Sequence, residues 1–190
     1  MRRGATGGGL VLSGSVFAAL AGRADAAVPP DNDLAYLRLL VGAELLAADF
    51  QAKALASEKL SRHSKTVIRK MAADEKAHYA KLAGLLTAAG QTPATSHDID
   101  FSYPSGSFTS QDSIVRLAGR LEHLMVGAYV GAIENVETPE WRLPIGQIAV
   151  NEAQHQGAFA ALRGGSVVGR TFARGLQMSA VSDALDEFES

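Results

Sequence analysis

The sequence predicts an all-α fold: an antiparallel four-helix bundle with a long crossover between helices 2 and 3, plus a small C-terminal helix. Two observations predict it. Of the 190 residues, 47% are hydrophobic but only 6% are aromatic, and together with heavy use of Ala and Leu this favours helices over a sheet. Apolar residues also recur at helical spacing along four segments, which glycine, proline and one long aperiodic stretch separate.

The first two helices are predicted from stripes that each contain a charged group. Asp31, Asn32 and Asp33 offer capping side chains before the first helix. The stripe of that helix is Leu37, Val41, Glu44, Ala48 and Leu55. The second helix is expected from about Ser61 to Ala89, with Gly90 as its C-terminal stop. Its stripe is Ile68, Met71, Glu75, His78, Leu82 and Leu85. An unpaired charge in such an apolar face would cost several kcal/mol, so these charged groups need partners.

Residues 91–111 break the helical periodicity. A loop of this length in a compact domain needs a reason, and a crossover along a bundle supplies one. Ser110 or Asp112 could then cap a third helix that runs to about Asn135. The inward stripe of the third helix is Leu117, Leu121, Glu122, Met125, Tyr129 and Ile133.

The remaining elements follow from proline and glycine. Pro139 and Pro144 are expected to bracket a short turn, and the fourth helix to run from near Pro144 to Leu162. Its stripe is Ile145, Ile148, Glu152, His155 and Phe159. Gly164 and Gly165 end it, and a small extra helix is expected from Ser179 to Phe188. The bundle is thus expected over 33–163, with a C-terminal tail over 164–190.

Two Glu-x-x-His segments each follow a lone glutamate at nearly the same distance: Glu44, Glu75, His78, Glu122, Glu152 and His155. On a helix, residues three apart differ by about 60° in azimuth and about 4.5 Å in height, so each Glu-x-x-His pair shares one face. Four-helix bundles use this ligand set to hold two metal ions in the core. Carboxylate and imidazole suit iron or manganese, and ligand type does not separate the two. The alternative is a coincidence of surface charges on a metal-free bundle.

Composition excludes several other functions. The formal net charge is −2, and no basic footprint for nucleic acid is present. The chain has no cysteine, which excludes disulfides, iron–sulfur clusters and thiolate zinc sites.

Residues 1–26 are predicted to be a cleavable export signal, followed by a linker over 27–32. Arg2 and Arg3 form a positive start, Leu10 to Ala21 is an apolar stretch too short to span a bilayer, and Ala24-Asp25-Ala26 is a cleavage pattern. The protein is therefore expected in the periplasm or outside the cell, without stable membrane insertion after cleavage. Both the twin-arginine and the general secretory routes stay open, and the alternative is a disordered tail.

Three segments carry a resemblance to a known family: Met71–His78, Leu121–Ala132 and Val150–His155. They resemble the ferritin-like domain of exported bacterial and desiccation-related proteins. The resemblance implies that Glu75 and Glu152 bridge two metals, that Glu44 and Glu122 are terminal carboxylates, and that His78 and His155 are terminal imidazoles.

The family often has a tyrosine seven residues after each lone glutamate. Tyr129 occupies that place after Glu122, but Gln51 occupies it after Glu44. Tyr129 is either a packed interior residue or one that assists the metal site by a hydrogen bond or an electron. The glutamine predicts altered redox behaviour in the first half.

Three functions remain open. The site could be a redox centre that oxidises Fe(II) or consumes dioxygen or peroxide, which would make the protein an oxidoreductase. The protein could instead store or buffer metal, or it could be a structural stress protein that metal merely stabilises. A homo-oligomer is possible in each case.

Overall fold

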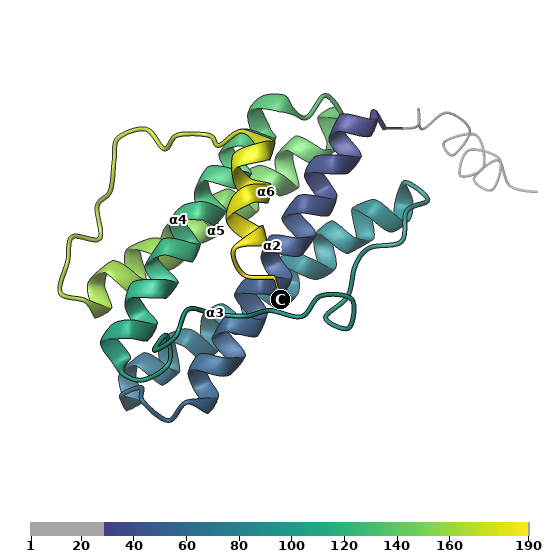
Figure 1. Ribbon diagram of the computed structural model, residues 1–190. Coiled ribbons are helices and arrows are strands. Elements are labelled where there is room, and N and C mark those ends of the chain that lie inside the picture. Colours follow the sequence, from purple (N-terminus) through teal and green to yellow (C-terminus); the bar gives the residue numbers. More distant parts are fainter. Residues whose placement is uncertain (1–28, 190) are drawn as a thin grey trace, which may run out of the picture.

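The computed structural model describes residues 29–189, and its regular structure there is helical (Figure 1). Helices α2 (Asp31–Ala56) and α3 (Arg62–Ala88) form one antiparallel hairpin, and α4 (Gln111–Asn135) and α5 (Pro139–Leu162) form the other. A short helix, α6 (Met178–Asp186), contacts α2 and α4. The predicted four-helix bundle with a small C-terminal helix is confirmed. The export signal expected over residues 1–26 lies outside the described residues.

Helices α3 and α4 begin and end where the sequence predicts. The Ser61 hydroxyl accepts a hydrogen bond from the Ser64 amide at 3.1 Å and so caps α3. Gly90 follows that helix with a φ of 74°, a left-handed conformation that glycine adopts without strain. At the start of α4, Ser110 and Ser113 form a reciprocal capping box. Of the two candidate caps, Ser110 is therefore the one used.

The expected turn between Pro139 and Pro144 is wrong, because α5 already begins at Pro139. A proline at the first helical position has no amide hydrogen to lose, and its fixed φ suits a helix. Pro144 then lies inside the helix as its sixth residue, where it removes one backbone hydrogen bond without ending the helix. Trp141 lies on this first stretch of helix and is buried.

The capping expected from Asp31–Asp33 is also wrong. Helix α2 has Pro30 at its cap position and no capping side chain. Asp33 instead lies inside α2, fully buried, and its carboxylate accepts hydrogen bonds from the Glu137 amide at 2.9 Å and the Thr138 amide at 2.7 Å. The Thr138 hydroxyl donates a third at 2.6 Å. Asp33 therefore joins the start of α2 to the start of α5.

The connection between α3 and α4 returns along the bundle, as Figure 1 shows, and aromatic residues attach it to α2. The Tyr103 hydroxyl donates to Asp49 Oδ2 at 2.8 Å, and the rings of Tyr103 and Phe108 lie 5.9 and 5.5 Å from the ring of Phe50. The Ser102 amide also donates to the Phe188 carbonyl at 2.7 Å. The crossover and the C-terminal end thus cover the same part of the core.

The segment from 163 to 177 arches from the end of α5 to α6 (Figure 1). It rejoins the bundle where the Leu176 amide donates to the Gly127 carbonyl at 2.8 Å. A Cβ atom at Gly131 would lie 2.0 Å from the Leu176 carbonyl oxygen, so this close approach requires glycine. Within residues 29–189, no helix is both long and apolar enough to cross a membrane.

Candidate metal centre

Each helix of the bundle contributes at least one of the six predicted site residues to the core. Helix α2 provides Glu44 and α4 provides Glu122, while α3 and α5 each provide a Glu-x-x-His pair. All six are buried, and none is more than 8% exposed: Glu44, Glu75, His78, Glu122, Glu152 and His155. The structure therefore brings together every residue that the repeated spacing singled out.

The six residues form two overlapping groups in which the potential ligand atoms lie within 4.8 Å of one another. The first group is Glu44, Glu75, His78 and Glu152. The second is Glu75, Glu122, Glu152 and His155. Glu75 and Glu152 belong to both groups, which is the placement that a bridging carboxylate would need. The two imidazole rings lie at either side, with their centroids 6.0 Å apart.

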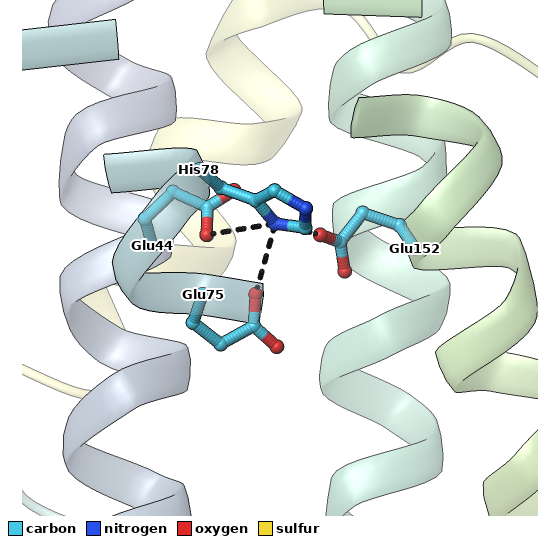
Figure 2. Close-up of side chains that lie close together, drawn as sticks. All are labelled: Glu44, Glu75, His78 and Glu152. Carbon is cyan, nitrogen blue, oxygen red and sulfur yellow. Dashed lines mark hydrogen bonds and ion pairs between the residues drawn. The ribbon is translucent and has the colours of Figure 1, made fainter. Parts of the chain in front are cut away.

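In the first group three carboxylates surround one imidazole nitrogen (Figure 2). His78 Nδ1 lies 2.8 Å from Glu152 Oε1, 3.2 Å from Glu75 Oε2 and 3.5 Å from Glu44 Oε2. Carboxylates this close repel one another unless a cation or a proton lies between them. The protonated imidazole can serve as that cation, and so can a metal ion.

The second group has the same form. His155 Nδ1 lies 3.2 Å from Glu75 Oε1, 3.4 Å from Glu152 Oε2 and 3.8 Å from Glu122 Oε2. Several buried ligand atoms have no hydrogen-bond partner within residues 29–189: Glu44 Oε2, Glu122 Oε2, both Glu152 oxygens and His155 Nδ1. Buried polar atoms are normally satisfied, so converging unsatisfied oxygens fit a metal site.

The electrostatics of the cluster give the glutamates different protonation. Burial, followed by the charges of Glu152 and Glu75, raises the pKa of Glu122 well above its usual value. Burial also raises the pKa of Glu44, although its contact with His78 opposes the shift. Burial acts in the same direction on Glu75, but contacts with His155 and His78 outweigh it and lower the pKa of Glu75 to about 2.

Both imidazoles hold protons strongly in the metal-free protein. Burial would lower the pKa of His78, but its contacts with Glu152, Glu44 and Glu75 raise the pKa to about 12. For His155, burial is likewise outweighed by Glu152 and Glu75, which raise the pKa to about 10. Two protonated histidines therefore supply the positive charge that metal ions would otherwise supply. A metal ion that binds these imidazoles must displace their protons.

The stability of the metal-free protein is expected to fall as the pH rises from about 5 to 9. Glu44, Glu122 and both histidines hold protons in the folded state at pH values where the unfolded chain, with pKa values of 4.5 and 6.5, has lost them. The contribution of these four groups to the free energy of unfolding is complete below their unfolded pKa values. It is lost as the pH rises through their raised pKa values in the folded protein. Glu75 has a lowered pKa, so its contribution to stability is lost as the pH falls below 4.5 and does not change the trend from pH 5 to 9.

Urea unfolding of chelator-treated protein at pH 5.5, 7.0 and 8.5 measures this trend. The Mn(II)-loaded protein provides the comparison, because metal competes with protons and its stabilisation grows with pH. A metal-free protein whose stability rises across this range would contradict the proton-holding cluster.

Asp74, which the sequence analysis did not single out, contacts His155 from the other side. Asp74 Oδ2 lies 3.4 Å from His155 Nε2, and Lys70 also pairs with this carboxylate. Burial raises the pKa of Asp74, but Lys70 and His155 together lower it. The carboxylate thus orients the ring so that Nδ1 faces the glutamates. The only signal in the sequence is that an acidic residue directly precedes Glu75. The role of Asp74 depends on its contact with His155 on another helix, which the sequence does not show.

Tyr129 and Gln51, the two positions seven residues after the lone glutamates, both hydrogen-bond to site carboxylates. The Tyr129 hydroxyl, fully buried, donates to Glu44 Oε1. The Gln51 side-chain amide donates to Glu75 Oε1 at 2.7 Å. Tyr129 therefore serves the glutamate of the opposite half, and the glutamine contacts one of the two shared carboxylates.

The fold and the cluster together define a class, the four-helix bundles that carry paired Glu-x-x-His helices around a carboxylate-rich core. The chain belongs to the ferritin-like domain family, whose model matches residues 32–165. No curated protein matches the chain. Among solved structures, it is similar in fold to the hypothetical protein MJ0754 from Methanococcus jannaschii DSM 2661, with a TM-score of 0.60 and 11% identity. That match covers 85% of this chain and 95% of the other.

Proposed function

We propose that this chain is an exported ferritin-like protein that binds a dinuclear iron or manganese centre and uses it for redox chemistry with Fe(II), dioxygen or peroxide. The observation that carries the proposal is the pair of overlapping ligand groups that share Glu75 and Glu152. Two adjacent metals held by these residues would supply two electrons to an oxidant together. Export is supported by the pattern of residues 1–26.

The residues of this chain would hold the metals and manage the protons. Glu75 and Glu152 would bridge the ions, and Glu44, Glu122, His78 and His155 would each bind one of them. The Tyr129 hydroxyl donates a hydrogen bond to Glu44, and Gln51 fixes the orientation of Glu75 through its amide. The buried position of all six ligands excludes bulk water from the reacting space.

The asymmetry between Tyr129 and Gln51 favours unequal metal positions. Tyr129 presents a phenol that can give up a proton and an electron, and burial and the nearby Glu44 raise its pKa well above the usual value. Gln51 can donate a hydrogen bond but cannot be oxidised in this way. Of these two positions, only Tyr129 would therefore offer an electron, beside the ion that Glu44 binds.

The test is a metal analysis of the full chain expressed in iron- and manganese-supplemented cells. The exported fraction is purified aerobically, its first residue is determined by mass spectrometry, and bound metal per chain is measured. We expect a chain that begins at Ala27 and carries two equivalents of iron or manganese, followed by turnover with Fe(II), dioxygen or peroxide.

Other results assign the protein to the alternatives. Two bound metals without turnover would indicate storage or buffering. A stably folded protein that binds no metal and cannot be reconstituted would remove both metal-dependent functions and leave a structural role. A protein that stays in the cytoplasm with residues 1–26 attached would remove export alone.

A further inference from the structure

A cavity of about 710 Å³ lies between the outer surface of the α4–α5 hairpin and the segment 163–177. It is at the height of the metal centre, because the lining residues His123, Ala153 and Gln156 directly follow Glu122, Glu152 and His155 in the chain. Its outer wall is formed by residues 166–176, which lie beyond the range matched by the family model. The cavity is therefore separate from the ligand cluster and is built partly from this chain's own C-terminal segment.

The segment is held at both ends and stands away from the helices between them. At one end the Gly165 amide donates to the Ala160 carbonyl at 2.9 Å, and at the other the Leu176 amide donates to the Gly127 carbonyl at 2.8 Å. The helices present small residues toward the segment, including Gly127, Gly157 and Ala160. Small residues below a segment with two attachment points leave the space that the cavity occupies.

The lining is cationic. It contains Arg170 and Arg174 and no aspartate or glutamate. Neither arginine makes a hydrogen bond or ion pair with any residue in the described range 29–189, so both guanidinium groups are available. An uncompensated pair of arginines beside a cavity favours an anion, which a guanidinium binds through two parallel hydrogen bonds.

A third donor lies on the helix side. The Gln156 side-chain amide donates to His123 Nδ1 at 2.9 Å across the gap between α5 and α4. The second hydrogen of the Gln156 amide group remains a hydrogen-bond donor. The polar groups of the lining are thus mainly donors, which again selects against a cationic ligand.

The rest of the lining is apolar or small, with Val126, Val167 and Leu176 as the larger members. In the same segment Val168 and Phe172 are 79% and 83% exposed, so more apolar surface lies beside the cavity. Pockets of about 300–1,000 Å³ accept small organic molecules, and an inorganic anion would leave the apolar wall uncovered. The ligand that matches both features has one anionic end and an apolar body.

We propose that this cavity binds a small anionic amphiphile, such as a medium-chain carboxylate, with its charged end at Arg170 and Arg174 and its apolar end along α4 and α5. Binding would bury apolar surface on both sides and would attach the segment 163–177 more firmly to the bundle. The proposal does not depend on the metal centre, because the cavity and the ligand cluster share no residue.

The test is calorimetric titration of the full chain with decanoate, at concentrations where decanoate does not form micelles. We expect one decanoate per chain, and at least a tenfold weaker Kd in the double variant R170A/R174A. Arg163→Ala is the matched control, since Arg163 is exposed, follows α5 directly and does not line the cavity. The affinity of this variant for decanoate should equal that of the unaltered chain. Ala160→Phe, which fills the apolar end, should also weaken binding at least tenfold, with circular dichroism to verify folding.

Three results would overturn the proposal. One is equal decanoate affinity for the double variant and the unaltered chain. Another is equally tight binding of decyltrimethylammonium, which would show a merely apolar surface. The third is equally tight binding of acetate, which would show an anion site without an apolar part. Each titration is repeated on the chelator-treated protein, where a carboxylate has no metal to bind, so that occupancy of the metal centre is not mistaken for occupancy of the cavity.

Discussion

Replacing Glu75 or Glu152 with alanine is expected to lower bound metal from two ions per chain to less than one. Each of these carboxylates belongs to both ligand groups, so either substitution removes a ligand from both metal positions at once. Removing ligands in this way typically weakens metal binding by orders of magnitude, because the remaining donors no longer complete a coordination sphere. Elemental analysis after gel filtration measures the stoichiometry.

The terminal glutamates provide the contrast. Glu44→Ala and Glu122→Ala each remove a ligand from one group only, so about one ion per chain should remain. Glu140→Ala is the neutral control, since Glu140 is exposed in the first turn of α5, twelve residues before Glu152. If two ions still bind stoichiometrically to E75A or E152A, the bridging assignment is wrong. Circular dichroism on each metal-free variant separates lost ligands from lost fold.

Asp33→Ala is expected to destabilise the protein by about 3 kcal/mol, whether or not metal is bound. The substitution leaves the Glu137 and Thr138 amides and the Thr138 hydroxyl without their acceptor, at the point where α5 begins. It also removes a negative charge from beside the N-terminus of that helix. For a domain of this size such a loss lowers Tm by about 8 °C, which calorimetry of the metal-free protein measures.

Asp31→Ala is the matched control for this prediction. Asp31 lies in the same first turn of α2 but is exposed, so its replacement should cost less than about 1 kcal/mol. Asp33→Asn retains one acceptor oxygen and should fall between the two. Equal losses of stability in D31A and D33A would contradict this prediction. They would mean that Asp33 acts only through its negative charge at the N-terminus of α2, and that its hydrogen bonds to α5 contribute nothing.

Most of the fold could be predicted because helices are specified locally. The stripes containing Ile68 and Leu117 repeat every three to four residues, and Ser61, Gly90 and Ser110 act on backbone groups within a turn of themselves. The prediction is wrong at α5, where Pro139 and Pro144 predict the two ends of a turn. Pro139 suits the first position of a helix, and α5 continues through Pro144 although that proline has no amide hydrogen to donate.

The six residues of the candidate metal centre were identified for the same local reason. A Glu-x-x-His pair shares a helix face whatever surrounds it, and a charged pair in an apolar stripe signals a partner in the core. That argument identifies which side chains point inward. Spacing along a helix does not identify Asp74, whose contact with His155 joins two helices. It also does not predict that Gln51 donates its hydrogen bond to Glu75.

The sequence by itself thus determined the helices, their inward faces and the set of six residues that meet in the core, because each depends on spacing within a single helix. Only the tertiary structure decided which carboxylates both groups share, where Asp33 places its carboxylate, and that a cationic cavity lies under residues 163–177. These features join residues that are tens of positions apart in the chain. Their geometry is set by how the helices pack, and spacing along a single helix carries no information about it.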